Sequence, residues 1–273
     1  SMYNRGFEIQ LSGDVIRTKD FVWNIDLNAT KLENKITKMP AQSKEIIDGT
    51  KKLKEGTSLY DYWLREYKGV NPENGVAEYR AISFVASNSR ITATGDTLTN
   101  NIANARFWYN GTSIPDLTGS VTNSIRYKGF TLSALMVYQL GGKIYDAAYA
   151  GLMGAGYHNA KHVDILNRWV NPGDKTNVPR MDNGRTADFD AASDRWLIDG
   201  SYMNVRSVTL SYNLPKTLAR KLKMDNAQVY LSGENFIMLS KRSGMNVQQN
   251  FGGTTSNVYS PAKSLVIGLS FSL

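Results

Sequence analysis

The sequence predicts an all-β protein whose antiparallel strands form part of a transmembrane β-barrel. Several segments alternate apolar side chains with small uncharged polar side chains, whereas a solvent-facing strand usually carries more Lys and Glu. Long polar stretches separate these segments, as the loops of a membrane barrel do. No apolar run approaches the roughly 20 residues that a transmembrane helix needs.

The stretch 194–215, DRWLIDGSYMNVRSVTLSYNLP, carries the clearest pattern. A turn is expected around Gly200, which has no Cβ to clash at positive φ. The apolar alternation slips by one at Arg206 and Ser207, as a β-bulge does. Pro215 should end the strand because it has no N–H to donate. One face then holds Met203, Val205, Val208, Leu210, Tyr212 and Leu214, and the other holds Thr209, Ser211 and Asn213.

Two hairpins show the same alternation. The first joins 7–15 to 21–29 through a turn at 17–20, and the second spans 117–140 with a turn at Lys128 and Gly129. Further strands are expected over 77–85, over 227–232 and at 265–273. The strands of the first hairpin approach the ~10 residues of a membrane-barrel strand.

The segments between these strands are predicted as loops. Residues 31–58, 87–104 and 241–257 lack alternation, and 59–70 is dense in aromatic residues. Residues 141–196 form the longest interruption, with a helix expected over 158–170. Another short basic helix is expected over 216–223. Long insertions of this kind usually carry binding or function.

Composition excludes several classes of protein. The 273 residues contain no Cys, so disulfides and thiolate metal sites are impossible. The formal net charge is +8. Because the basic residues are spread, apart from the patch at 216–223, a solvated basic surface is favoured over nucleic-acid binding. The segment 1–10 has no apolar core of a signal peptide, and the chain is interpreted as a fragment of something longer.

Candidate metal and catalytic motifs are weak. His158 and His162 would share a helix face, with Asp164 nearby, but no Glu completes a zinc-protease motif, and a structural role is favoured. An acidic run could bind Ca²⁺ through oxygen ligands, although its spacing differs from an EF-hand and a solvated loop is favoured. It comprises Asp182, Asn183, Asp188, Asp190 and Asp194. Gly141-Gly142-Lys143 lacks the following Ser or Thr of a phosphate-binding loop. No catalytic residue and no cofactor are assigned.

Motifs along nearly the whole chain resemble the SusC/RagA type of TonB-dependent outer-membrane transporter. They are YNRGFEIQLSGDVIRTKDFVW, YKGVNPENG, IPDLTGSVTNSIRYKGFTLSALMVYQLGGKIYD, DRWLIDGSYMNVRSVTLSYNLP, VYLSGENFIMLSKRSGMNV and SPAKSLVIGLSFSL. The sequence departs from the family in the segment after Gly244, which lacks an acidic turn, and in ending on Leu273 rather than an aromatic residue.

The resemblance implies a barrel of about 22 strands. Residues 1–273 would be the C-terminal part of that barrel domain, without the plug, and would supply roughly nine or ten strands. It implies TonB-dependent uptake of oligosaccharides or peptides across the outer membrane of a member of the Bacteroidetes. The implied partners are a SusD-like surface lipoprotein, TonB through the missing N-terminal part, and outer-membrane lipid.

Aromatic residues of the long insertion are the candidate substrate contacts, because aromatic faces stack on sugar rings. They also fill the cores of loops, and that alternative stays open. The candidates are Tyr145, Tyr149, Tyr157 and Trp169. Strand aromatics such as Trp23, Tyr127 and Phe271 are expected in the interfacial girdles of the barrel.

A second hypothesis is a soluble β-sandwich that binds carbohydrate. Such a module would bury its rows of Leu, Val and Phe in a dry interior and turn Ser and Asn toward solvent. The barrel hypothesis predicts the opposite arrangement.

Overall fold

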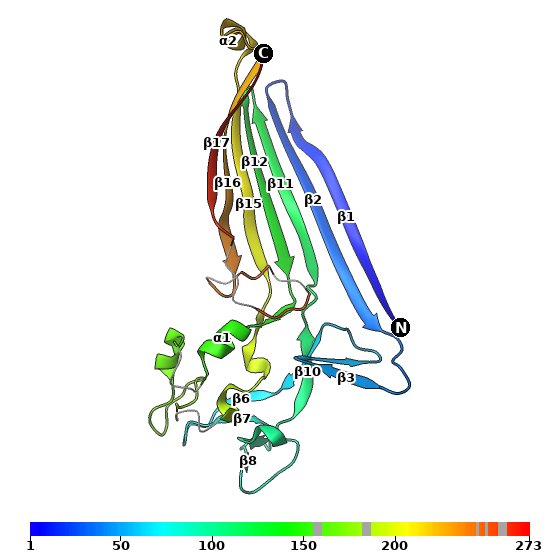
Figure 1. Ribbon diagram of the computed structural model, residues 1–273, viewed down its shortest axis with the longest axis vertical. Coiled ribbons are helices and arrows are strands. Elements are labelled where there is room, and N and C mark those ends of the chain that lie inside the picture. Colours follow the sequence, from blue (N-terminus) through cyan, green and yellow to red (C-terminus); the bar gives the residue numbers. More distant parts are fainter. Residues whose placement is uncertain (155–159, 182–186, 244–245, 249–250, 256–260) are drawn as a thin grey trace.

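The computed structural model describes residues 1–154, 160–181, 187–243, 246–248, 251–255 and 261–273 (Figure 1). Seven long strands dominate it: β1 (Met2–Arg17), β2 (Phe21–Ile36), β11 (Leu117–Tyr127), β12 (Phe130–Leu140), β15 (Tyr202–Asn213), β16 (Asn226–Ser240) and β17 (Ser264–Ser272). They form one antiparallel sheet in the order β1-β2-β11-β12-β15-β16-β17.

The two ends of this sheet differ. At one end, tight turns and the short helix α2 (Lys216–Lys221) join neighbouring strands; at the other, the chain leaves the sheet for long excursions (Figure 1). The excursions between β2 and β11 and between β12 and β15 are the longest. We call the second end the loop end and the first the turn end.

The described part of the chain contributes seven strands to the sheet, so the prediction of nine or ten was too high. The difference arises in part because the strand expected over 77–85 forms only a short strand over 77–80, in a separate small sheet between β2 and β11. The sheet is open, with β1 and β17 as its edges.

The predicted bulge in β15 is confirmed. Val205 pairs with Met136 and Ser207 pairs with Leu135, which leaves Arg206 as the extra residue. The pairing with β16 shifts at the same place. Without this extra residue, half of the strand would present its side chains on the wrong face.

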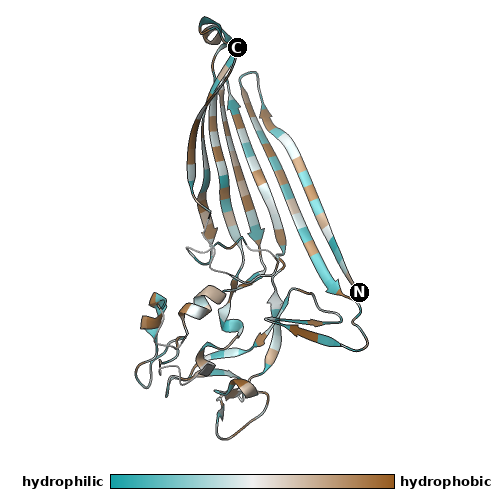
Figure 2. Cartoon of the chain, in the orientation of Figure 1, coloured by the Kyte–Doolittle hydropathy of each residue, from teal (hydrophilic) through white to brown (hydrophobic). Residues whose placement is uncertain are grey.

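Hydrophobic and hydrophilic residues alternate along the long strands (Figure 2). The pairing of the strands aligns them, so that apolar rows lie on one face of the sheet and polar rows on the other. One paired apolar row comprises Trp23, Ile125, Leu132, Leu210, Leu231 and Ile267. The neighbouring row comprises Asp14, Asn24, Ser124, Ser133, Thr209, Ser232 and Val266.

The apolar rows are open to the surroundings. Leu231 is 41% exposed and Ile267 is 76% exposed, whereas Asn204 on the polar face is 1% exposed. This is the reverse of a soluble sheet, in which apolar rows are covered. The β-sandwich hypothesis is therefore wrong, because it requires these rows to lie in an enclosed interior.

The polarity of the alternation reverses in the last part of β2. From Phe21 to Ala29 the apolar side chains occupy the open face, but Lys31, Glu33 and Lys35 continue the same face and are exposed. On the opposite face Asn34 and Ile36 are buried. The open apolar band thus ends between Ala29 and Lys31, at the loop end of the sheet.

The excursions fold into small sheets of their own. The first excursion holds β3 (Glu45–Asp48), β4 (Lys51–Lys54), β5 (Asp61–Arg65), β6 (Tyr67–Val70), β7 (Ala77–Arg80), β8 (Ser89–Ile91), β9 (Thr97–Thr99), the 3₁₀ turn η1 (Ile102–Asn104) and β10 (Phe107–Thr112). Their orders are β10-β5-β4-β3 and β6-β7-β9-β8.

The second excursion is mostly irregular. It holds β13 (Lys143–Tyr145), α1 (Ala147–Leu152), the 3₁₀ turns η2 (Val163–Asn167), η3 (Ala187–Asp190) and η4 (Asp194–Trp196), and β14 (Leu197–Asp199), which pairs with β13. The helix predicted over 158–170 is wrong for the described residues 160–170, which contain only η2. The helix lies earlier instead, where the side chain of Asp146 caps α1 by accepting from the N–H of Tyr149.

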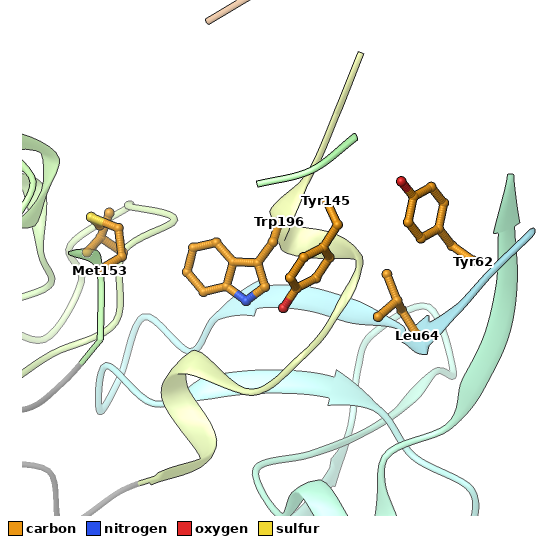
Figure 3. Packing of buried hydrophobic residues seen from close by; sticks show 6 residues of the cluster. Tyr62, Leu64, Tyr145, Met153 and Trp196 are labelled. Atoms are coloured by element: carbon orange, nitrogen blue, oxygen red, sulfur yellow. The ribbon is translucent and has the colours of Figure 1, made fainter. Parts of the chain in front are cut away.

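Both excursions share a hydrophobic core (Figure 3). Tyr62 and Leu64 of the first excursion lie in one buried cluster with residues of the second, namely Tyr145, Met153, Val178 and Trp196. The Tyr62 hydroxyl lies 2.6 Å from the carbonyl oxygen of Gly253, which belongs to the segment between β16 and β17. All three long connections are thus packed into one unit, which we call the loop unit.

No helix in the described ranges combines the length and the apolar character needed to cross a bilayer.

Candidate functional site

The polar face of the sheet is a wall of small hydrogen-bonding side chains. Asn28 donates to the Ser120 hydroxyl at 2.7 Å, and the hydroxyls of Thr209 and Ser232 lie 2.8 Å apart. Ser12 pairs with Asp26 on the same face. Such groups are satisfied by one another and by water, so the wall suits a wet lumen.

A pocket of about 490 Å³ lies on this wall at the loop end of β15 and β16. It is lined by Asn204, Asn235, Met238, Leu239, Ser240, Arg242, Ser243, Asn246, Pro261 and Lys263. Amides, hydroxyls and two cationic side chains dominate this lining. Such a set can hydrogen-bond a polar ligand with few net charges.

Two side-chain amides of the pocket have oxygen atoms that could still accept a hydrogen bond. The Oδ1 atoms of Asn204 and Asn235 are buried and have no hydrogen-bond partner among the described residues. The Nδ2 of Asn235 donates to the carbonyl of Ala262 at 3.1 Å, which ties the strand to the next connection. Buried acceptors without a donor are costly, so a donor from a ligand or water would be stabilising here.

Arg242 connects the pocket to the loop unit. Its Nε lies 2.7 Å from Oδ2 of the buried Asp146, and its guanidinium lies 3.9 Å from the centre of the Tyr149 ring. Because Asp146 also caps α1, one carboxylate fixes both the helix and the pocket wall.

The aromatic candidates differ in their burial and in their contacts. Tyr145 is 9% exposed inside the core cluster, and burial raises the pKa of its hydroxyl. Tyr149 is half-buried, and its hydroxyl donates to Asp164 at 2.7 Å. Trp169 donates to the carbonyl of Pro72 at 2.9 Å, and its ring covers Gly75. Tyr157 lies outside the described residues. Of the three candidates that the structure describes, only Tyr149 adjoins the pocket, through Arg242.

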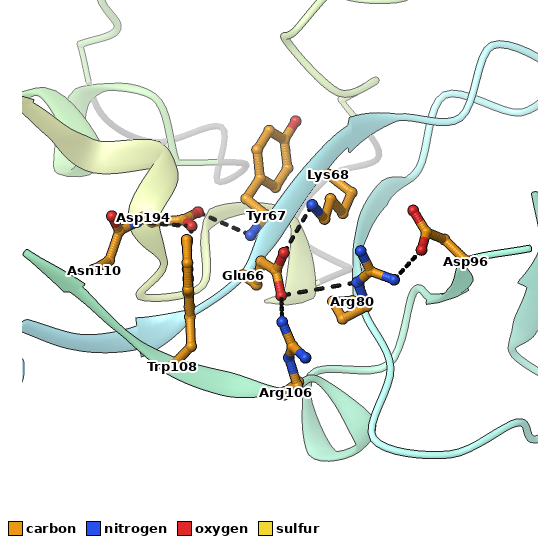
Figure 4. Close-up of polar contacts among 9 residues, drawn as sticks. All are labelled: Glu66, Tyr67, Lys68, Arg80, Asp96, Arg106, Trp108, Asn110 and Asp194. Atoms are coloured by element: carbon orange, nitrogen blue, oxygen red, sulfur yellow. Dashed lines mark hydrogen bonds and ion pairs between the residues drawn. The ribbon is translucent and has the colours of Figure 1, made fainter. Parts of the chain in front are cut away.

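A half-buried carboxylate joins the two long excursions (Figure 4). Asp194 accepts from the N–H of Tyr67 at 2.8 Å, from the indole of Trp108 at 3.0 Å and from the amide of Asn110 at 2.9 Å. Burial raises its pKa, while these donors oppose the shift. Nearby, Glu66 forms ion pairs with Lys68, Arg80 and Arg106.

Two of the metal-ligand candidates in the described ranges are engaged in contacts within the protein. His162 accepts from the N–H of Asp164, and Asp194 is taken by its three donors. His158, Asp182 and Asn183 lie outside the described residues. Within the described ranges, no group of three or more His, Asp and Glu side chains could hold a metal ion.

Sequence reasoning missed Asn204, Asn235, Arg242 and Lys263 as pocket residues. Asn204 carried a signal, since it is an amide on the polar face next to the strand end. Asn235 could also have been found from the sequence, because the residues Gly-Glu-Asn interrupt the alternation of β16. Asn235 adopts a φ of 55° there. Arg242 and Lys263 lie in irregular segments, where no pattern indicates orientation.

Comparison with known proteins found relatives along almost the whole chain. The chain is 27% identical over 258 residues to TonB-dependent receptor P3 of Formosa agariphila, covering 91% of the chain and 25% of the receptor. It is 25% identical over 287 residues to TonB-dependent receptor SusC of Bacteroides thetaiotaomicron, covering 99% of the chain and 26% of SusC. The chain thus spans about a quarter of the length of these relatives. No protein-family profile matches it.

Solved structures share the fold. A structure of the RagAB peptide transporter superposes with a TM-score of 0.85 at 21% identity, covering 99% of the chain and 29% of that protein. A structure of the RagAB peptide importer in an open-open state gives a TM-score of 0.77 at 21% identity, over 100% of the chain and 29% of that protein. The open apolar rows, the similarity to these receptors and the shared fold together show that the chain resembles part of the β-barrel of SusC/RagA-type TonB-dependent transporters.

Proposed function

We propose that the chain forms the C-terminal part of the β-barrel domain of an outer-membrane nutrient importer. The observation that carries this proposal is the inverted polarity of the seven-stranded sheet, with open apolar rows and a polar wall. In this arrangement the apolar face meets lipid and the polar face lines a wet passage. The loop end faces outward from the cell, because membrane barrels have short periplasmic turns and long extracellular loops.

Thiol labelling tests this orientation, because this chain contributes no native Cys of its own. In the membrane-inserted transporter, Leu27→Cys and Leu210→Cys are expected to resist a membrane-impermeant maleimide. Asn28→Cys and Thr209→Cys, their neighbours on the polar face, should react. Fast labelling of the Leu positions together with protection of the polar positions would refute the proposal.

The substrate in this proposal is an oligosaccharide or a peptide, bound at the polar pocket beside β15 and β16. Sugar hydroxyls and peptide amides are both donors and acceptors, and both can satisfy Asn204 and Asn235. The solved neighbours are named for peptide transport and one curated relative is SusC, so both classes are supported. Tyr145, Tyr149, Tyr157 and Trp169 remain proposed contacts, among which the geometry favours Tyr149.

The proposed partners follow from the same family. They are TonB, which would act through a part of the transporter outside this chain, and a SusD-like lipoprotein on the loop unit. The proposed import is not enzymatic, in keeping with relatives that are named as receptors.

Filling the pocket tests substrate binding. Ser240→Trp should block the space beside Asn204 and reduce uptake of labelled oligosaccharides or peptides at least tenfold. Ser240→Ala, at the same position, should leave uptake within about twofold, because it removes one hydrogen bond from the Ser240 hydroxyl to the nearby Arg242 carbonyl. Unchanged uptake by Ser240→Trp would exclude this pocket from the route.

A further inference from the structure

A basic rim lies on the lipid-facing side of the sheet, directly beyond the end of the apolar band. Its cations are Arg5 on β1 and Lys31 and Lys35 on β2, and all three are exposed. They lie on the apolar face, because Phe7 pairs with Lys31, Arg5 with Glu33, and Tyr3 with Lys35. Arg5, Lys31 and Lys35 therefore lie on the same face of the sheet as Ile9, Leu11 and Leu27, farther toward the loop end.

The charges of the rim do not cancel. Glu33 is its one anion, and it accepts from Arg5 at 2.8 Å and from the Tyr3 hydroxyl at 2.9 Å. In the described part of the chain, neither Lys31 nor Lys35 forms an ion pair. Three cations against one anion leave a net charge of +2 on this part of the face.

The spacing suits the boundary between hydrocarbon and headgroups. Lys31 and Lys35 lie four residues apart on one strand, which places their Cα atoms about 14 Å apart, with Glu33 and its partner Arg5 between them. Phe7 is 76% exposed beside Lys31, so the apolar and cationic parts meet without a gap. Lys and Arg at such a boundary keep their stems in the apolar zone and their charged ends in the headgroup layer.

The other end of the apolar face has a different character. There the paired row consists of Phe21, Tyr127, Phe130 and Tyr212 with Val229 and Leu269, and the rings of Phe130 and Tyr212 lie 4.4 Å apart. This is an aromatic girdle of the kind found at both membrane interfaces. The basic rim is therefore a feature of the loop end of β1 and β2 rather than a general property of the face.

We propose that Arg5, Lys31 and Lys35 form a binding site for the phosphate groups of lipids in the leaflet at the loop end. The site orients the headgroup through the N–H donors of Arg5 that Glu33 does not use, and attracts it through the two unpaired lysines. Attraction of this kind weakens with added salt. The site rests on the proposed membrane orientation, and it is independent of which substrate is imported.

Lipid titration tests the site on the intact transporter in neutral detergent. The probes are phosphatidic acid, whose phosphate monoester is exposed, and phosphatidylcholine, whose phosphate is neutralised. The variant Arg5→Gln/Lys31→Gln/Lys35→Gln should bind phosphatidic acid at least fivefold more weakly, since one basic residue near an anionic lipid is worth about fivefold. Phosphatidylcholine binding should not change.

The matched control removes the same residue types at the turn end. Lys216→Gln/Arg220→Gln/Lys221→Gln changes two Lys and one Arg that are exposed in α2, and it should alter binding less than twofold. If the triple variant at the rim misfolds, Lys31→Gln/Lys35→Gln keeps the Arg5–Glu33 pair and should still lose affinity.

Equal loss in both triple variants, or none at the rim, would overturn the site. Binding of inorganic phosphate with no preference for phosphatidic acid would also overturn it as a lipid site. Thiol labelling at Leu27→Cys separates the two proposals: a protected Leu27 with unchanged lipid binding removes the rim and leaves the barrel assignment intact.

Discussion

Among single residues, Lys51 is the most unusual ionisable group of the loop unit. Its Nζ lies 3.3 Å from the centre of the Tyr62 ring and donates to the Tyr60 carbonyl at 2.7 Å and the Ser113 hydroxyl at 3.1 Å. Burial lowers its pKa to about 7, although attraction to Asp61 opposes the shift. Lys51 lies against Tyr62 of the shared core, so we expect the packing of the loop unit to depend on pH.

The sign of this effect follows from proton binding. Below about pH 7 the amine is charged in both the folded and the unfolded loop unit, so the burial cost is fully present. Between about pH 7 and the ordinary pKa near 10.5, the unfolded state binds more protons, and stability rises with pH. We expect slower hydrogen exchange in 45–65 at pH 9 than at pH 6.5, after correction for the intrinsic rate.

Lys51→Met should remove most of this pH dependence, because it replaces the amine with an uncharged side chain of similar length. Lys54→Met, on the same strand but exposed, should preserve it. An identical pH response in the wild type and Lys51→Met would show that another group is responsible.

At the scale of single elements, the tight contact between β2 and β11 depends on Gly119. A Cβ at this position would lie 2.1 Å from the Asn28 carbonyl oxygen and 2.6 Å from the Tyr138 hydroxyl. The Tyr138 hydroxyl donates to that same carbonyl at 3.1 Å, so its ring covers the glycine. Aromatic cover of a strand glycine is a known way to fix sheet register.

Gly119→Ala should therefore weaken the barrel, by about 1–3 kcal/mol, as overpacking typically does. The expected measurement is a lower temperature for loss of the compact, heat-modifiable band of the intact transporter in electrophoresis. Gly13→Ala is the control, since a Cβ there meets nothing within 4 Å. If Gly119→Ala is as heat-stable as Gly13→Ala, then β2 and β11 can accommodate the added methyl group at no cost in stability.

The wall strands could be predicted because an apolar face and a polar face on the same strand impose a two-residue period. That rule also located the bulge at Arg206, where a change of phase has no other simple cause. The same rule failed beyond Ala29. There the open face carries exposed charged residues, while Asn34 and Ile36 on the other face are buried against the loop unit. The alternation is therefore reversed, and the sequence of this part of β2 resembles that of a loop.

The loop unit was predictable only in part, because its short strands depend on contacts between distant segments. Tyr62 and Trp196 meet in one core although they are far apart in sequence. Tyr145 and Trp169 were selected as aromatic residues of a long insertion, but whether a ring faces a ligand or the core is set by tertiary packing. The helix α1 had a local signal, the cap Asp146, that was overlooked.

At the scale of the whole molecule, the chain has the polarity of a membrane protein and the edges of an incomplete sheet. β1 and β17 each present one unpaired side, and both carry exposed apolar residues, including Phe7 and Leu11 on β1 and Ile267 and Leu269 on β17. Unpaired edges with apolar side chains are templates for association. In a closed barrel, other strands cover those edges and lipid covers the apolar rows.

The 273-residue chain expressed by itself is therefore expected to self-associate in detergent-free buffer. The loop unit has its own buried clusters and can retain structure, but the open rows of the sheet cannot be buried within one copy of the chain. Light scattering after size-exclusion chromatography should show oligomers or aggregates, and a mild detergent should shift them toward smaller species.

Charged substitutions at both edges, such as Phe7→Lys with Ile267→Lys, should reduce association, because edge lysines oppose strand pairing. A monomer with one cooperative unfolding transition in plain buffer would mean that the rows find cover within the chain, and the lipid-facing assignment would then fail.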